Sequence, residues 1–285
     1  MSHLGSSGIE TMAQSGPRHE RDPEPPVGTL LREWRAARRM SQLDLALEAD
    51  MSARHLSYVE TGKAQPSREA VGRLADALGM PLRERNALML AAGYAPLFSE
   101  TPLPALDRMR DAIELILQHQ EPYPAFVVSR SWEVLRANQA AVRMNQFLMQ
   151  GRPLRHANML HQVFDPEDFR PVIVNWEEVA DRFIRHLHEE IAAVPADPAP
   201  RRLLDEILAY PDVPARWRLR DVANGPAPIV HLVFRSPAGE VRFFETITTF
   251  AAPRDVTLAE LRIECSFPAD DHTADVCARL RDGTL

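Results

Sequence analysis

The sequence predicts two structural classes in one chain: an all-α N-terminal domain of five helices, and an α+β C-terminal domain with a five-stranded antiparallel sheet. Three observations lead to this prediction. The 285 residues exceed the usual size of one domain. Helix-sized apolar repeats with capping residues fill the first third, whereas segments with strand character begin only at Tyr123. Between them, Gly93 to Pro104 contains three prolines and no helical period, which is typical of a linker.

These patterns divide the chain into four parts. Residues 1–27 are rich in Gly, Ser, Pro and charge without apolar periodicity, so we expect a disordered N-terminal arm. The helical domain is expected at residues 28–93, the linker at 94–104 and the α+β domain at 105–285.

Two short helices separated by a tight turn are predicted between Ser41 and Glu60. Ser41 can accept a hydrogen bond from the free amides of the first helix, and Asp44 can complete a weak capping box. Ser52 is a natural N-cap for the second helix, and Gly62 supplies the left-handed residue that commonly ends one. One shared apolar face is predicted from Leu45, Ala46, Ala49, Leu56 and Val59. A generic pair of amphipathic helices is the alternative interpretation.

The second helix of this pair has a polar side. Its apolar residues occupy one face only, so Ala53, Arg54, Ser57 and Tyr58 should point outward together. Small, cationic and hydroxylated side chains suit the edges of bases in a major groove. These four residues are therefore the candidate base contacts.

Three further helices should surround the pair. The first is expected from Thr29 to Arg39, with Leu31 and Trp34 in the core. The fourth should run from Arg68 to Leu78, and a fifth should open at Pro81.

This order of segments resembles the XRE family of helix-turn-helix regulators from Gly28 to Gly93. Met51-Ser52 and the run from Val59 to Lys63 match it closely. The resemblance implies base contacts from Ala53, Arg54 and Tyr58, an ion pair between Arg35 and Glu60, and phosphate contacts from Gln42 and Lys63. Ser52 is a further candidate phosphate contact. The chain has Asp50 where the family commonly has Gly, so this turn should hold a strained left-handed residue.

The second half alternates helices and strands. Helices are expected from Leu106 to His119, Asn138 to Met149, Pro171 to Ala193, Arg201 to Ala209 and Ala269 to Leu280. Strands are expected at Ala125 to Ser129, Trp132 to Arg136, Pro228 to Arg235, Glu240 to Phe250 and Thr257 to Phe267. Pro237 to Gly239 is a turn signal that makes the third and fourth strands a hairpin. Helices mainly on one face of this sheet would give a sensor-like domain.

Three segments of this half are distinctive: YPAFVVSRSWEVLRANQAA from Tyr123, VNWEEVADRFIRHL from Val174, and ETITTFAAPRDVTLAELRIECSFPADD from Glu245. They resemble the ligand-binding domain of MmyB-like transcription regulators, and the resemblance runs over about Leu106 to Leu280. The resemblance implies a PAS-like fold and a small apolar ligand such as a fatty acid. The chain departs from the family at Ala251-Ala252, where Gly-Thr is more usual.

An acyl chain would need an apolar slot beneath the helices and a polar group at its mouth. The candidate wall residues are Phe126, Trp176, Phe183, Phe243, Phe244 and Ile247. The candidate head-group contacts are Asn138, Thr248 and Arg262. The alternative for each aromatic is ordinary core packing.

Composition restricts the functional classes. The net charge is −7, but residues 28–93 carry ten Arg and Lys against eight Asp and Glu, so only this segment is mildly basic. Two cysteines, no signal-peptide pattern and no long apolar run predict a reduced cytoplasmic chain outside the membrane. The sequence has no recognisable zinc spacing, nucleophile elbow, phosphate loop or dinucleotide fingerprint. We therefore expect no enzyme activity, metal or cofactor.

The combined hypothesis is a DNA-binding transcription regulator controlled by an apolar ligand in its second domain. A modest basic footprint favours a homodimer on a roughly palindromic double-stranded operator. The alternative is that the second domain is a ligand-free dimerisation or protein-interaction module.

Overall fold

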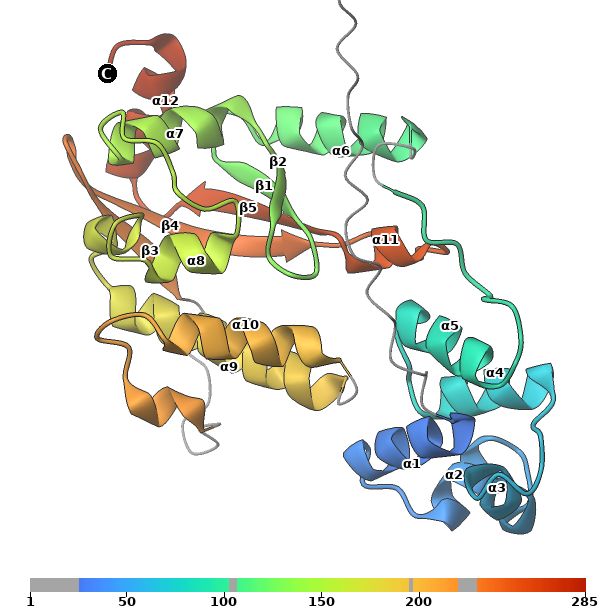
Figure 1. Cartoon of the computed structure of the whole chain (residues 1–285). Helices are drawn as coiled ribbons and strands as arrows, with labels where there is room; N and C mark the ends of the chain where they lie inside the picture. Colours follow the sequence, from blue (N-terminus) through green and yellow to red (C-terminus); the bar gives the residue numbers. More distant parts are fainter. Residues whose placement is uncertain (1–25, 103–106, 195–196, 220–229) are drawn as a thin grey trace, which may run out of the picture.

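The computed structural model describes residues 26–102, 107–194, 197–219 and 230–285. Its N-terminal region is a bundle of five helices, and its C-terminal region is an α+β assembly with one sheet (Figure 1). Residues 1–25 of the expected arm, the end of the expected linker and the start of the Pro228 strand lie outside the described residues. The last two residues of the expected arm, Pro26 and Val27, are the N-cap and the first residue of α1. The five helices are α1 (Val27–Ala37), α2 (Gln42–Glu48), α3 (Ala53–Glu60), α4 (Arg68–Ala77) and α5 (Leu82–Ala91).

Local hydrogen bonds set the limits of α2 and α3 as predicted. Ser41 Oγ accepts from the Asp44 amide at 3.1 Å, and the Asp44 carboxylate accepts from the Ser41 amide at 2.8 Å. Ser52 Oγ accepts from the His55 amide at the start of α3. Asp50 has φ = 49°, so the turn between the helices uses the left-handed conformation expected at this position.

The helical core is small and fully enclosed. Its largest buried side chains are Leu31, Trp34, Leu45, Leu56, Leu74, Leu78 and Leu88. Helix α1 crosses the end of α3 so closely that a Cβ at Gly28 would lie 2.8 Å from the Val59 carbonyl oxygen. A glycine at this position therefore permits the packing of α1 on α3.

The C-terminal region contains five strands: β1 (Ala125–Val128), β2 (Val134–Ala137), β3 (His231–Ser236), β4 (Gly239–Thr248) and β5 (Arg262–Pro268). They form an antiparallel sheet in the order β2-β1-β5-β4-β3. The helices are α6 (Asp107–His119), α7 (Gln139–Leu148), α8 (Met159–Phe164), α9 (Trp176–Ala193), α10 (Pro198–Leu208), α11 (Val256–Glu260) and α12 (Asp271–Asp282). Short 3-10 turns occur at Arg170–Val172 and Ala215–Arg218. The predicted hairpin of β3 and β4 is confirmed, with Ser236 opposite Gly239.

The sheet has two differently covered faces. Helix α6 packs through Ile113 and Leu117 against alternate residues of β1 and β5, including Val127 and Ile263. Side chains of opposite parity, such as Val128 and Phe243, join a larger core with helices α7 to α10. Most helices therefore share the second core, and this core contains the cavity described below.

Two sequence predictions were wrong in detail. The expected strand from Thr257 to Phe267 is divided, because Asp255 accepts hydrogen bonds from the Thr257 and Leu258 amides and starts helix α11. The strand itself begins only at Arg262. Helix α8 was not predicted. Asn158 caps α8 by accepting a hydrogen bond from the Leu160 amide. Almost all side chains of α8 are buried.

Candidate functional site

The exposed face of α3 is the candidate DNA-reading surface. Arg54 and Tyr58 are exposed one turn apart, and Ala53 and Ser57 are half-buried beside them. Arg54 Nε donates to Tyr58 Oη at 3.1 Å, and its guanidinium lies 5.5 Å from the centre of the tyrosine ring. This pair fixes a cation and a hydroxyl at one position on the helix surface.

A buried ion pair holds α3 in place. Arg35 donates to both carboxylate oxygens of Glu60, at 2.8 and 3.0 Å, and also to the Met40 carbonyl oxygen. The Glu60 side chain is only 1% exposed. Hydrogen bonding to the Glu60 carboxylate raises the pKa of the Arg35 guanidinium. The predicted contact between Arg35 and Glu60 is confirmed.

The candidate phosphate contacts lie around the two ends of α3. Ser52, the N-cap, and Lys63, just beyond the C-terminal end, are both exposed. Gln42 is half-buried, and its amide nitrogen donates to Glu60 Oε2 at 2.7 Å. The Gln42 side chain therefore also braces the base of α3, a role that the sequence did not suggest.

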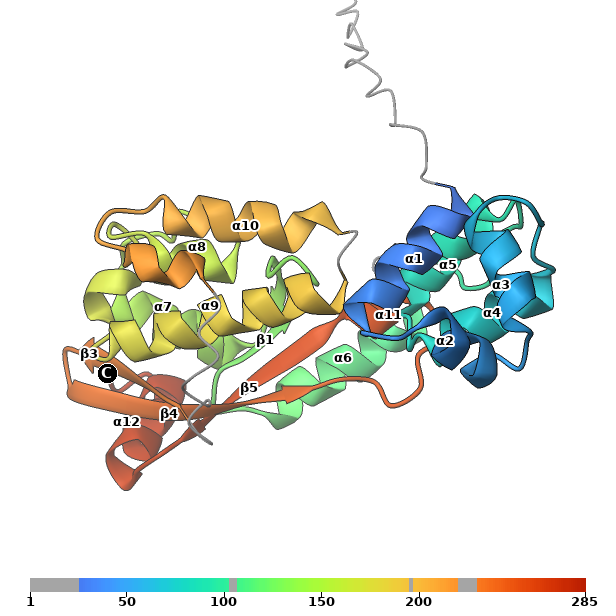
Figure 2. The same ribbon diagram turned by 90° about the horizontal axis from the view of Figure 1, so that it is seen from below.

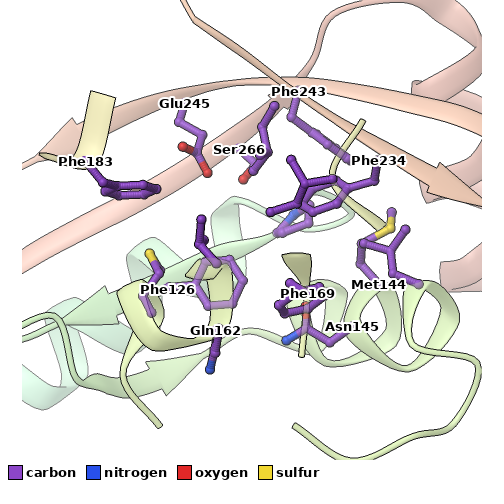
Figure 3. Close-up of a pocket in the computed structure, with 16 residues that line it drawn as sticks. Phe126, Met144, Asn145, Gln162, Phe169, Phe183, Phe234, Phe243, Glu245 and Ser266 are labelled. Atoms are coloured by element: carbon purple, nitrogen blue, oxygen red, sulfur yellow. The ribbon is translucent and has the colours of Figure 1, made fainter. Parts of the chain in front are cut away.

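A cavity lies between the sheet and helices α7, α8 and α9 (Figure 3). The volume of this cavity is about 70 Å³. Of the predicted wall residues, Phe126, Phe183 and Phe243 line it. Other apolar walls come from Met144 and Leu148 of α7, Met159 and Val163 of α8, Phe169, Ile173, and Leu232 and Phe234 of β3.

Three other candidates on β4 lie outside this cavity. Phe244 has the opposite strand parity from Phe243, and it stacks on Phe267 with ring centres 5.3 Å apart. Ile247 has the correct parity, but it is 52% exposed and does not line the cavity. Thr248 is exposed at the end of the strand.

The remaining three candidates have structural partners. Trp176 donates from Nε1 to the Val163 carbonyl oxygen at 2.8 Å and stacks under Arg170. Asn138 caps α7, accepting from the Ala141 amide and donating to the Tyr123 carbonyl oxygen.

Arg262 forms an ion pair with Glu190 and lies over the Trp132 ring at 4.9 Å. Glu190 belongs to the C-terminal part of α9. None of the three predicted head-group contacts lines the cavity.

The polar lining of the cavity comes from Glu245, Ser266, Asn145 and Gln162. Glu245 and Ser266 are direct cross-strand neighbours on β4 and β5. Figure 3 shows both side chains pointing from the sheet towards the cavity. The sequence signal for Glu245 is the period-two alternation of a strand, which places it on the same face as Phe243.

A second carboxylate lies next to this pair. Glu264 faces the same side of the sheet, since its cross-strand neighbours are Phe126 and Ile247. It is 4% exposed. Burial, followed by the charge of Glu245, raises the pKa of Glu264 to about 8, while Arg182 and Arg262 oppose the shift.

The helical and α+β regions meet through α5 and α11 (Figure 2). Arg83 of α5 donates to both carboxylate oxygens of Glu260 in α11, at 2.7 and 2.9 Å, and to Glu100 at 2.6 Å. Arg130, in the turn between β1 and β2, lies 3.6 Å from Glu260 and 4.0 Å from Glu84 of α5. Charged groups thus link α11 and the turn between β1 and β2 to the last helix of the helical bundle.

Two negative findings apply to the described residues. They contain no group of three His, Cys, Asp or Glu side chains arranged to hold a metal ion. No helix among the same residues combines the length and the apolar character needed to cross a bilayer.

Comparisons with known proteins agree with this architecture. The sequence model of a helix-turn-helix domain matches residues 26–88, and that of the MmyB-like transcription regulator ligand-binding domain matches residues 109–280. Among curated proteins, none matches the chain significantly.

One similar solved structure is that of an RNA-binding light-oxygen-voltage receptor, at 12% identity and a TM-score of 0.24. The similarity covers 91% of this chain but only 64% of that one, and it is too weak to support an argument. The match to the ligand-binding domain, by contrast, spans more than half of the sequence. The chain therefore belongs to the family of MmyB-like transcription regulators.

Proposed function

We propose that this chain binds double-stranded DNA sequence-specifically as a homodimer, and that a small apolar ligand in the cavity modulates that binding. The observation that supports it most is the outward face of α3, with Arg54 and Tyr58 exposed and Ala53 and Ser57 half-buried beside them, on a helix braced by a bidentate buried ion pair. A rigid helix with a cation and a hydroxyl at fixed positions is suited to reading base edges in a major groove. Ser52 and Lys63, both exposed at the two ends of this helix, would contact phosphates.

Control by a ligand needs a mechanical connection between the cavity and α3. The ion pairs of Arg83 with Glu260, and of Arg130 with Glu84, provide contacts between the sheet region and α5. A ligand that binds one arrangement of the two regions more tightly than another would shift the spacing of two α3 helices in a dimer. Because the half-sites of such dimers lie about 34 Å apart, small rotations would change DNA affinity.

Selection of bound duplexes from a random pool tests the DNA-reading proposal. The expected result is an inverted repeat whose half-sites lie about one helical turn apart. Arg54→Ala should relax the preference at one base pair by roughly 1–3 kcal/mol. Lys63→Ala should weaken binding to all duplexes and lower its salt dependence by about one charge. Arg279→Ala, which removes an exposed cation from the distant α12, is the control. An unselective pool would refute the proposal.

The ligand class implied by the family resemblance is fatty-acid-like. The cavity walls are mainly aromatic and aliphatic, which suits an acyl chain. Its volume of about 70 Å³ is well below the roughly 300 Å³ at which ligand pockets usually begin. A full acyl chain would therefore require the walls, including Phe126 and Phe183, to move apart.

The small volume supports a second candidate, in which this region is a ligand-free module for dimerisation or protein interaction. Native mass spectrometry after gentle purification distinguishes the two. A retained lipophilic mass that is lost on extraction, together with altered DNA affinity, supports the ligand-controlled regulator. Stable dimers with no retained mass and no response to lipid extract support the second candidate.

A further inference from the structure

The turn between β1 and β2, at residues 129–133, has a strained and closely bonded backbone. Trp132 has φ = 68°, a left-handed conformation that bulky residues rarely adopt. Its amide donates to the Ser129 carbonyl oxygen at 3.0 Å, and the Ser129 amide donates to the Glu133 carbonyl oxygen at 2.9 Å. A backbone in this conformation persists only where its surroundings hold it, so the contacts of this β1–β2 turn determine its position.

The β1–β2 turn contacts two walls of the cavity. The Trp132 carbonyl oxygen accepts from the amide of Met159, a wall residue of α8, at 2.9 Å. The neighbouring Asn158 donates from Nδ2 to the Ser131 carbonyl oxygen at 2.7 Å. The Trp132 ring is 2% exposed and packs edge-to-face on Phe183, a wall residue of α9, with ring centres 5.3 Å apart. Because side chains in a packed core have little free space, a displacement of Phe183 or α8 would also displace the turn.

The β1–β2 turn also reaches the helical bundle. Arg130 forms an ion pair with Asp197 at the start of α10, and it lies 3.6 Å from Glu260 and 4.0 Å from Glu84 of α5. The Glu84 side chain is 13% exposed, so water screens its interaction with Arg130 only in part. A cavity of about 460 Å³ adjoins the turn at residues 129–131, which leaves room for the turn to move. A shift of the turn would therefore change an electrostatic contact with α5.

We propose that the β1–β2 turn transmits occupancy of the cavity to the helical bundle, and that Trp132 is the residue that couples the two. A ligand that displaces Phe183 would displace the Trp132 ring, and the turn would then move Arg130 relative to Glu84. Trp132 does not line the cavity itself, so its role is a positioning one. This inference rests on the proposed ligand control and names the route by which that control acts.

The route is tested by the DNA affinity of the full chain on the selected operator duplex, measured by fluorescence anisotropy with and without dodecanoate, a probe of the fatty-acid class. We expect the two affinities of the parent to differ by about five-fold or more. Trp132→Leu removes the ring contact with Phe183 and should bring their ratio to within about two-fold of one. The variant should bind dodecanoate at least as tightly as the parent, because Phe183 can move into the space that the ring leaves. A purely structural role of Trp132 would instead weaken both dodecanoate and DNA binding.

Two further variants make this result specific. Trp217→Leu is the matched control, because Trp217 is another buried tryptophan of the same core and packs on Trp176; it should keep the ratio of the parent. Arg130→Gln changes a partly exposed charge and should lower the ratio without disturbing the core, so it serves as the test if Trp132→Leu does not fold. A parent-like ratio in Arg130→Gln, or in folded Trp132→Leu, would overturn the inference and leave the ligand control intact. An equal loss in Trp217→Leu would also overturn it.

Leu148→Phe makes the test independent of the ligand's identity. Leu148 lines the cavity from α7, so a larger side chain would occupy part of its volume of about 70 Å³. We expect this variant to change DNA affinity without any ligand, and adding Trp132→Leu should cancel about half of the change or more. If dodecanoate has no effect on the parent but this double-mutant cycle shows coupling, the inference stands and only the proposed ligand class fails. If neither dodecanoate nor Leu148→Phe changes DNA affinity, the proposed control of DNA binding and this inference both fail.

Discussion

The buried carboxyl of Glu264 provides a test of the electrostatics at the sheet. The group lies on the central strand β5, and its pKa is raised from 4.5 to about 8, mainly by burial and then by Glu245. The folded protein therefore binds a proton at the Glu264 carboxyl more tightly than the unfolded chain does. Below about pH 4.5 the carboxyl is protonated in both states, so it costs no stability there. The cost appears as the pH rises from there to about 8, where the carboxyl ionises.

The size of this cost follows from the shift. A pH of 7 lies about 2.5 units above the pKa of 4.5 that the carboxyl has in the unfolded chain. This difference corresponds to at most about 3 kcal/mol of lost stability. Glu264→Gln has nearly the same shape and no charge, so it should remove this pH dependence. We expect the variant to melt higher than the parent by up to ~6–12 °C at pH 7, and at nearly the same temperature at pH 4.5.

Thermal unfolding followed by circular dichroism from pH 4.5 to 9 measures this difference. Subtracting the parent curve from the variant curve cancels the titration of all other groups. Glu240→Gln, on the exposed part of β4, should give a difference near zero throughout. A difference curve for Glu264→Gln that does not change with pH would refute the buried, proton-bound state of this carboxyl.

Three further predictions concern the helical bundle and its connection to the sheet. Arg35→Ala leaves the Glu60 carboxylate buried without its main partner and should cost about 3–5 kcal/mol in urea unfolding; a cost below 1 kcal/mol would contradict the bracing role. Gly28→Ala forces a Cβ against the backbone of α3 and should cost about 1–3 kcal/mol, whereas Gly72→Ala, with open space around it, should not destabilise the fold. Arg83→Ala removes the partly exposed ion pair with Glu260 that joins α5 to α11, so the free energy of unfolding should change by less than about 1 kcal/mol. The ratio of DNA affinities with and without bound ligand should move towards one. An unchanged ratio would exclude this route of coupling.

Much of the helical bundle could be predicted because its signals are local. Ser41 with Asp44, and Ser52 alone, specify helix starts through hydrogen bonds within three residues, and the structure contains each of them. Asp50 was placed in the left-handed turn for a similarly local reason. The sheet was also predicted, because strand alternation and the turn at Pro237 are short-range features.

Residues of the cavity were harder to predict, because strand parity gives the face but not what covers it. Phe243 and Ile247 share a face of β4, but helices cover only the first of them. Asn138 and Arg262 are suitable head-group contacts by residue type. In the folded chain, however, Asn138 accepts a hydrogen bond from the Ala141 amide, and Arg262 forms an ion pair with Glu190. Helix α8, which supplies one wall, has buried residues all around it and therefore no amphipathic period to detect.

The sequence alone determined the order of elements, the turn and caps of the helix pair, and the identity of the side chains that face outward on α3, since all of these depend on neighbours within one or two helical turns. The tertiary structure decided which charged groups meet. Glu245 of β4 has Arg182 of α9 as its partner, whereas Arg262, on the same strand as Glu264, is bonded to Glu190 of α9. The interaction between two charges depends on the distance between them, and these charges belong to segments far apart in the chain. Their partners could therefore be identified only from the folded structure.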